Sequence, residues 1–329
     1  MESIVLFDPS IRSLNLGDHI IMDSSERQLA EITRGRFTLK CATHAPVVTF
    51  YQNTRRNPRM RFYDEAKYKF VCGSNLLWRR LSVPRPTFNI NPFNCMPYEG
   101  CVLLGVGSDS GNKEMDGYTR RLYRKVLSAE YVHSTRDDKT KTIVESLGLK
   151  AINTGCPTMW NFTEDFCLEI PSAKAEDVVF TLTDYNRDAE RDREMIRILK
   201  RNYRRVSMWL QGAFDEEYLD ELGEREGIHL VGPSLAAFDE ALSAGDVDYV
   251  GTRLHAGMYA LQHKRRSIIL IVDERVRSMR ASYGINCLER EAISDLDGLI
   301  NSNVPTRMNI NEDAINTWLS QFEKGPVYR

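Results

Sequence analysis

The segment YVGTRLHAG, residues 249–257, is a short apolar strand that runs directly into a helix-forming stretch. The periodicity changes from that of a strand to that of a helix at the turn, which places Arg253 and His255 on the first turn of the helix. The same succession recurs through the second half of the chain, with strands expected at 178–181, 206–210, 228–231 and 268–272. Repeated strand–helix units predict an α/β fold with a parallel, doubly wound sheet.

The first half of the chain carries the same alternation less cleanly. Strands are expected at 4–7, 37–41, 69–72, 101–106 and 130–134, with helices at 18–33, 117–127 and 139–147. Because one pattern appears in both halves, we expect two such sheets rather than one.

A proline and small polar residues interrupt the alternation near residue 171, so we expect a domain boundary there. The prediction is two Rossmann-like doubly wound domains facing a central cleft, the first over residues 1–171 and the second over residues 172–300. Residues 301–329 are expected to form a helical segment that packs back on the domains, because the stretch 312–322 is amphipathic.

Composition and charge are those of a globular protein. Of the 329 residues 42% are hydrophobic and 27% are charged, and the net charge of −2 excludes a strong general attraction to nucleic acid or to anionic membranes. The seven cysteines show no metal-ligand spacing, so they are expected to be reduced thiols, and no metal is predicted. The absence of a signal-peptide pattern and of a long apolar run predicts a cytoplasmic protein.

The strongest candidate for chemistry is the start of the helix after the strand at 249–252. Free backbone N–H groups there favour an anion, and Arg253 adds a guanidinium fork that suits carboxylate or phosphate. His255 can act as an acid or a base near neutral pH. The structural alternative is a surface arginine beside a helix-capping histidine.

Two further segments also follow predicted strands. Asn15-Leu16-Gly17-Asp18 opens the first helix, where Asp18 either caps the helix or accepts a proton from a bound hydroxyl. Arg136 either holds a second anionic group or pairs with the neighbouring Asp137 and Asp138.

Other charged segments are interpreted as structural. Asp246 and Asp248 are expected to be solvated charges rather than metal ligands. The arginines at positions 55, 56, 59 and 61 are expected to form a solvated loop, with a phosphate-binding or membrane-facing surface, together with Arg79 and Arg80, as the functional alternative.

Taken in order, five segments of the chain resemble the polysaccharide pyruvyl transferase family. The last of them is similar to the family's G-x-R-x-H-A signature, and the five are Asn15–Asp18, Cys72–Leu77, Arg136–Asp137, Thr154–Trp160 and Gly251–Ala256. The resemblance implies a GT-B-like fold of two facing Rossmann-like domains. It also implies transfer of the enolpyruvyl carbons of phosphoenolpyruvate onto two hydroxyls of a sugar, which gives a pyruvate ketal in polysaccharide biosynthesis.

The resemblance also implies roles for individual residues. Arg136, Arg253 and His255 are expected to grip the donor, with His255 as the catalytic acid and Asp18 as the base. The expected substrate-binding set is completed by Leu254 at the helix start, Asn15 and Gly17 in the first turn, and Arg275, which stands where the family often has a lysine. The second domain is then the donor side and the first the acceptor side.

Two other functions remain open at this stage: a GT-B-type glycosyltransferase that uses a nucleotide-sugar, and a catalytically silent family member that binds a glycan or a partner protein. For the leading hypothesis the expected partners are phosphoenolpyruvate and a lipid-linked or nucleotide-linked sugar, with no cofactor. Contact with the inner face of a membrane and a homo-oligomer are also considered.

Overall fold

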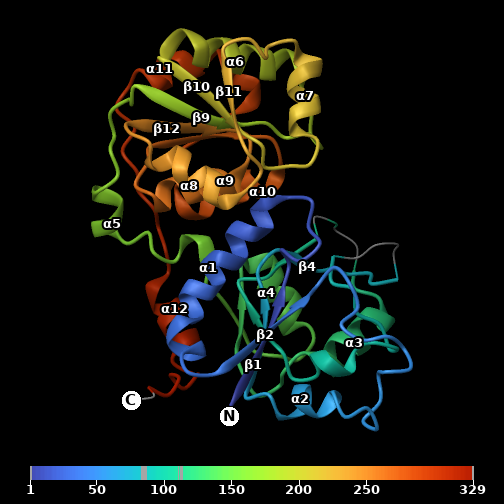
Figure 1. The fold of residues 1–329 in the computed structure, drawn as a ribbon. Coiled ribbons are helices and arrows are strands. Elements are labelled where there is room, and N and C mark those ends of the chain that lie inside the picture. The colour runs from blue at the N-terminus through green and yellow to red at the C-terminus, as the bar shows by residue number, and fades with distance from the viewer. Residues whose placement is uncertain (1, 83–86, 110, 112–113, 328–329) are drawn as a thin grey trace. The chain divides into compact units, whose positions relative to one another are not determined.

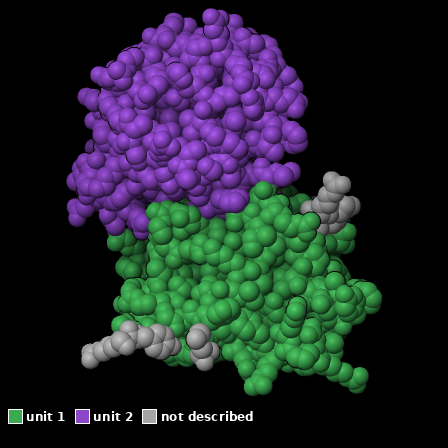
Figure 2. All heavy atoms as spheres, in the orientation of Figure 1, with its two compact units in different colours: residues 1–13, 21–160, 311–329 green, residues 14–20, 161–310 purple. Residues whose placement is uncertain are grey.

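The computed structural model covers the chain and describes every residue except 1, 83–86, 110, 112–113 and 328–329. The backbone divides into two compact units (Figure 2). Unit 1 comprises residues 1–13, 21–160 and 311–329, and unit 2 comprises residues 14–20 and 161–310. The division after Trp160 lies before the expected boundary at residue 171, and a short piece near the N-terminus belongs with the second half.

Unit 2 contains a six-stranded, fully parallel sheet. Its strands are β9 (Asp177–Thr181), β10 (Arg205–Trp209), β11 (Ile228–Val231), β12 (Val247–Gly251), β13 (Ser267–Ile271) and β14 (Cys287–Glu289). They lie in the order β11-β10-β9-β12-β13-β14, which is the order of dinucleotide-binding Rossmann domains. The strand order reverses between β9 and β12, and ligands of such sheets bind beyond the carboxyl ends at that point.

Helices cover both faces of this sheet (Figure 1). On one face, buried strand residues such as Val178 and Phe180 pack against α6 (Ala189–Asn202), α7 (Asp215–Leu222) and α11 (Leu296–Ile300). The other face carries α8 (Leu235–Ser243), α9 (Leu254–Gln262) and α10 (Glu274–Tyr283). Gly257 lets α9 approach the sheet closely, because a Cβ at that position would lie 2.6 Å from Cδ1 of Ile269.

Unit 1 contains a parallel sheet in the order β2-β1-β3-β5, built from β1 (Ser3–Asp8), β2 (Phe37–Ala42), β3 (Tyr68–Cys72) and β5 (Val102–Leu104). Beside it lie two parallel strand pairs, β4 (Asn75–Leu77) with β6 (Gly107–Ser108), and β7 (His133–Thr135) with β8 (Ala151–Asn153). A histidine side chain joins β5 to β7, since the Leu103 N–H donates to Nδ1 of His133 (3.1 Å).

One helix of unit 1 comes from the C-terminal part of the chain. They are α1 (Leu16–Thr33), whose first residues belong to unit 2, α2 (Met60–Glu65), α3 (Gly117–Val126), α4 (Asp138–Glu145) and α12 (Glu312–Leu319). Trp318 of α12 is fully buried, with its ring centroid 5.9 Å from that of Phe70 and 5.8 Å from that of Trp160. Of the expected C-terminal segment 301–329, residues 301–310 belong to unit 2 and residues 311–329 to unit 1, and α12 is the helix it contributes.

Most predicted elements are confirmed within a few residues, and the elements that were missed are short. The missed elements are α2, β4, β6, β8, β14, α5 (Glu164–Leu168), α11 and the 3-10 helices Met96–Tyr98, Pro157–Met159 and Arg290–Asp295. The strand expected at 130–134 begins at His133 instead.

The prediction that Asp248 is a solvated charge is wrong. β12 begins at Val247, so Asp248 lies inside a central strand and is only 1% exposed. Its carboxylate accepts hydrogen bonds from the hydroxyl of Tyr203 (2.7 Å) and from Nε of Arg266 (3.1 Å). Arg266, equally buried, also donates to the carbonyls of Ile300 and Ser302. A buried carboxylate persists because it is paired and hydrogen-bonded, and here the pair ties a loop to the sheet.

Candidate functional site

Three loops of unit 2 lie at the carboxyl ends of adjacent strands around the reversal of strand order. Asp184 and Tyr185 follow β9, residues 211–215 follow β10, and residues 252–255 follow β12. This is the end of the sheet at which the fold places ligands. The strongest cluster expected from the sequence therefore lies where the topology favours a site.

Arg253 is held at the centre of these loops and is only 3% exposed. Its Nε donates to the carbonyl of Leu182 (2.7 Å), and its Nη2 donates to Oδ1 of Asp184 (2.8 Å) and Oδ1 of Asp215 (2.6 Å). The alternative of a surface arginine is therefore wrong. The hydrogen bonds to described residues use Nε and Nη2, and none of them uses Nη1.

The sequence suggests an uncompensated positive charge at Arg253, but two carboxylates are bonded to its guanidinium. Burial raises the pKa of Asp215, although the Arg253 guanidinium and the Gly212 N–H oppose that shift. Burial lowers the pKa of Arg253, but Asp215, Tyr185 and Asp184 together more than compensate, so that pKa lies above its usual value. With both carboxylates ionised, the three groups carry a net charge of −1, so Arg253 is not an uncompensated cation.

A pocket of about 250 Å³ opens at this cluster. Tyr185 forms part of its wall, and the Cζ atom of Arg253 lies 4.9 Å from the centre of that ring. The lining residues are Leu14, Asn15, Asp184, Tyr185, Gly212, Ala213, Phe214 and Arg253. A concave site with aromatic walls and a few polar groups is suited to a small ligand.

The N-terminal turn docks onto the loop after β10. The Leu16 N–H donates to the carbonyl of Gln211 (2.9 Å) and the Ala213 N–H to that of Leu14 (3.2 Å). Oδ1 of Asn15 accepts from Nε2 of Gln211 (2.8 Å), although the two residues are 196 positions apart, and from the N–H of Gly17 (2.9 Å). Asn15 thus both shapes its own turn and fastens it to the site.

Gly17 lies close to Gln211 and to the catalytic candidate His255. A Cβ at position 17 would lie 3.0 Å from Nε2 of Gln211 and 3.4 Å from Nδ1 of His255. His255, the second residue of α9, is 8% exposed. The structure therefore brings the first and the last of the five segments together within unit 2.

The other expected residues of this cluster are placed as follows. Asp18 lies half-buried in the first turn of α1. Leu254 opens α9 and its side chain is buried, so its contribution to a ligand would be the backbone N–H. Arg275 lies in the first turn of α10, but its side chain is outside the described part of the structure.

Arg136 lies in unit 1, directly after β7. It is buried, and its N–H donates to the carbonyl of Val106 (3.0 Å). Its guanidinium lies against Gly107, where a Cβ would be 2.4 Å from Cζ of Arg136. Nη2 of Arg136 forms an ion pair with Oδ2 of Asp137 at 3.3 Å. Asp137 also caps α4 by accepting from the N–H of Thr140 (2.8 Å). The pairing alternative is thus present, and the ligand role of Arg136 stays a prediction.

Sequence reasoning missed Asp184, Tyr185, Gln211 and Asp215. Each stands just beyond a predicted strand, so the rule that ligands bind at carboxyl ends could have indicated them. No local pattern separates them from ordinary helix caps, because their role depends on contacts with Asn15 and Arg253.

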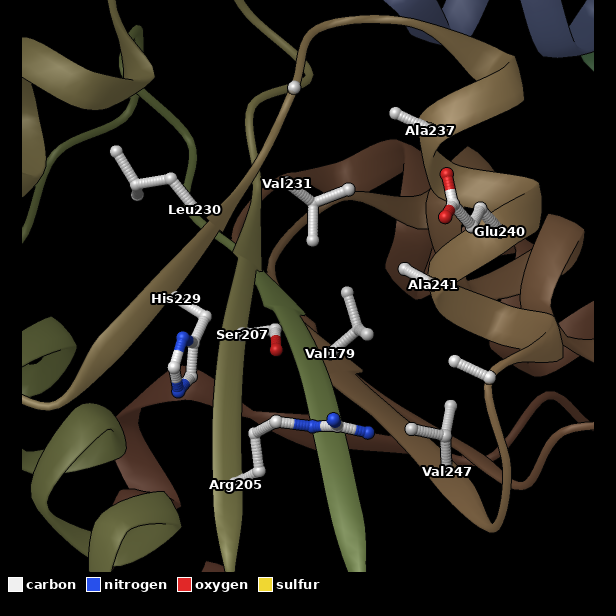
Figure 3. A pocket seen from close by; sticks show the side chains of 12 residues that line it. Val179, Arg205, Ser207, His229, Leu230, Val231, Ala237, Glu240, Ala241 and Val247 are labelled. Atoms are coloured by element: carbon white, nitrogen blue, oxygen red, sulfur yellow. The ribbon is translucent and has the colours of Figure 1, made fainter.

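A second hollow of unit 2, of about 410 Å³, lies against the sheet beside α8 (Figure 3). Arg205 and His229 line it, and Glu240 of α8 points toward it. None of the predicted site residues lines this hollow, and Arg205 is paired with Asp177 at 2.7 Å. In the described part of the chain, no group of three or more His, Cys, Asp or Glu side chains could hold a metal ion.

A sequence model of polysaccharide pyruvyl transferases matches residues 15–274. The chain belongs to the polysaccharide pyruvyl transferase family. The match begins at Asn15 and ends at Glu274, so it contains the N-terminal turn, Arg136 and the start of α9, and it stops one residue before Arg275. No curated protein shows a significant match to this family member.

Several solved structures are similar to this member of the family in backbone arrangement. The UDP-GlcNAc 2-epimerase from Neisseria meningitidis, bound to UDP-GlcNAc, is 11% identical with a TM-score of 0.50 and aligns over 98% of this chain and 100% of its own. MnaA from S. aureus with UDP is 10% identical (TM-score 0.48, 100% of both chains). The lipopolysaccharide outer core galactosyltransferase WaaB is 10% identical (TM-score 0.46, 98% of this chain and 95% of its own). At this identity the likeness concerns the fold alone, which is GT-B-like with two Rossmann-like domains.

Proposed function

We propose that this protein transfers the enolpyruvyl carbons of phosphoenolpyruvate onto two hydroxyls of a sugar, forming a pyruvate ketal and releasing phosphate. The acceptor is a lipid-linked or nucleotide-linked sugar of glycan assembly, and the reaction needs no cofactor because phosphoenolpyruvate is itself the activated donor.

One observation carries the proposal: the turn at Asn15–Gly17, the loop at Gln211 and the ring of His255 are in contact in unit 2. A proton donor, main-chain N–H groups and a half-buried carboxylate on the same turn are the groups that such a transfer needs. Family membership supports the same reaction.

The donor carries a phosphate and a carboxylate. We assign one of these anionic groups to the backbone N–H groups of Leu254 and Ala256 at the start of α9 and to Nη1 of Arg253. We propose separately that Arg136 of unit 1 binds an anion. Asp184 and Asp215 fix the orientation of the Arg253 guanidinium, and they also reduce its attraction for an anion. The helix start therefore supplies an important part of the anion binding.

The reaction begins with transfer of a proton from His255 to the methylene carbon of the donor, whose double-bond electrons form the new C–H bond. The adjacent carbon becomes oxocarbenium-like, and the first sugar hydroxyl adds to it while Asp18 accepts the hydroxyl proton. The C–O bond to phosphate then breaks, and the second hydroxyl closes the ketal and gives up its proton. The two hydroxyls together release two protons. One goes to the departing phosphate, and the other restores the proton that His255 gave to the methylene carbon.

Replacement of His255 by Ala is expected to lower acceptor-dependent phosphate release at least ~100-fold, because general acid catalysis contributes about that much or more. Phosphate release from phosphoenolpyruvate is measured with a panel of UDP-linked sugars and lipid-linked sugars. The matched control is His229→Ala, since His229 is an exposed histidine of the same unit that lies outside the cluster. Unchanged turnover in His255→Ala would contradict the assignment.

The same preparation distinguishes the glycosyltransferase alternative. A nucleotide-sugar-dependent enzyme would release UDP from UDP-sugars without phosphoenolpyruvate, and UDP-sugars alone would raise its melting temperature. The proposed enzyme is expected to release phosphate only when donor and acceptor are both present.

A further inference from the structure

Two loops of unit 1 form a single surface apart from the candidate site. The loops are residues 43–59 and 87–95, and we call them together the aromatic face. They are joined by hydrogen bonds from Nδ2 of Asn53 to the carbonyl of Pro92 (3.1 Å) and from the N–H of Asn89 to the carbonyl of Thr43 (2.8 Å).

Three large aromatic side chains stand exposed on this face. Phe50 is 73%, Tyr51 68% and Phe93 69% exposed, and the rings of Phe50 and Tyr51 contact each other edge to face at 5.5 Å. Between the loops lies a shallow apolar pocket of about 520 Å³, lined by Pro46, Val48, Thr49, Phe50, Asn91, Phe93 and Asn94. A contiguous apolar patch of this kind on a protein surface marks an interaction site.

The charge of the aromatic face is positive. Residues 43–59 include three arginines and no acidic residue, and residues 87–95 carry no charge. Arg55 is neutralised by Asp64 and Glu99 at 3.2 Å each. The exposed Arg56 and Arg59, by contrast, form no ion pair with any described residue, so their charge is available to an anionic partner.

We propose that the aromatic face docks this protein on an anionic lipid bilayer. Aromatic rings enter the boundary between headgroups and acyl chains, and unpaired arginines beside them are attracted to anionic headgroups. No helix among the described residues is long and apolar enough to cross a membrane. Three of the arginines that the sequence suggested for such a surface are already paired with carboxylates. Arg55 pairs with Asp64 and Glu99, Arg61 with Glu65, and Arg79 with Asp109.

Vesicle co-sedimentation of the full chain tests this proposal without any substrate, so its outcome is independent of the proposed reaction. The vesicles contain phosphatidylcholine alone or phosphatidylcholine with phosphatidylglycerol. Binding is expected only to the mixed vesicles and is expected to decline in 1 M salt.

Two variants address the two parts of the surface. Arg56→Gln with Arg59→Gln is expected to weaken partitioning about 25-fold, since each basic residue at an anionic surface contributes about fivefold. Phe50→Ser with Tyr51→Ser and Phe93→Ser is expected to weaken it at least ~10-fold. The controls are Tyr118→Ser for an exposed aromatic and Lys150→Gln with Arg307→Gln for exposed cations outside both loops.

Equal binding by the parent and either variant would overturn the proposal, as would no binding to the mixed vesicles or equal binding to uncharged ones. The melting temperature of each variant shows whether it is folded. If sedimentation instead shows that the parent associates with itself and the Ser variant does not, the face is a contact between copies of the chain and the lipid proposal fails.

Discussion

At the scale of single residues, the N-terminal turn shows how a short motif acquires a function. Asn15 accepts the N–H of Gly17 within its own turn, as asparagine commonly does, and the same oxygen atom accepts from Gln211. Gly17 leaves room for Gln211 and His255 where any side chain would meet them. The glycine is required by close approach rather than by a left-handed backbone.

Gly17→Ala is expected to lower kcat about 10- to 100-fold while changing the melting temperature by only a few degrees. The new methyl group would lie 3.0 Å from Nε2 of Gln211 and 3.1 Å from Oδ1 of Asn15, so these groups must shift by a few tenths of an ångström, and it would touch Nδ1 of His255 at 3.4 Å. Catalysis is sensitive to such displacements beside the proton donor. Phosphate release and thermal unfolding are the measurements. Gly298→Ala, where a Cβ meets nothing within 4 Å, is the matched control in the same unit. Equal kcat in the two variants would show that the turn does not position His255.

Arg253 illustrates what the sequence could and could not predict at this scale. Its place at the helix start was correctly expected, because the change of periodicity at residues 252–254 is local. Its surroundings were not, since Asp184 and Asp215 lie 69 and 38 positions away. A guanidinium expected to attract anions thus belongs to a cluster in which carboxylates outnumber it.

At the scale of elements, the junction of β5 and β7 depends on one buried imidazole. Nδ1 of His133 accepts the Leu103 N–H, and Nε2 lies 2.9 Å from the carbonyl of Ser128, to which it donates in the neutral form. Burial lowers the pKa of His133 to about 4, so the ring is neutral at pH 7. Protonation would remove the acceptor that Leu103 uses.

This geometry predicts an acid-sensitive unit 1. Because the pKa of His133 is lower in the folded chain than the usual value of 6.5, its stabilising contribution is complete above pH 6.5 and is lost as the pH falls toward 4. The free energy of unfolding by urea should decrease by up to about 3 kcal/mol over that range.

The control for this prediction is His133→Gln, which offers an acceptor and a donor but does not titrate. Its free energy of unfolding should depend less on pH than that of the parent by about the same amount. If the two proteins follow the same pH dependence, the imidazole does not control the junction.

Prediction of elements from sequence succeeded where the pattern is long. The helices α1, α3, α6 and α12 and the buried strands of unit 2 repeat an apolar spacing over enough residues to be recognised. Strands of two or three residues such as β4, β6 and β8 carry too few residues to show a period, and they exist because neighbouring strands supply their hydrogen bonds.

At the scale of the whole molecule, unit 1 is assembled from three separate segments of the chain. The last segment contributes α12, whose Trp318 stands among Phe70, Trp160 and Phe322. The N–H of Gly325 donates to the carbonyl of Glu31 (2.7 Å), and the side chain of Gln321 donates to Val132 (2.9 Å). The end of the chain is therefore part of the core of the unit that begins it.

Trp318→Ala is expected to destabilise unit 1 by about 3–5 kcal/mol, since it leaves a large cavity in a closed aromatic cluster. In the described part of the chain, Nε1 of Trp318 is buried without a hydrogen-bond partner, so Trp318→Phe should cost less. Urea unfolding monitored by circular dichroism gives both values. A loss below about 1 kcal/mol for the Ala variant would show that α12 is dispensable for the unit.

The sequence by itself determined the alternation of strands and helices and the membership of the family. These depend on local periodicity and on residue order, both of which are present in the linear chain. Only the tertiary structure decided that residues 14–20 belong with the second sheet, that Asn15 meets Gln211 and that two carboxylates balance Arg253. The physical reason is that a hydrogen bond or an ion pair depends on distance in space, and parallel strands bring together loops that the sequence separates by tens to hundreds of residues.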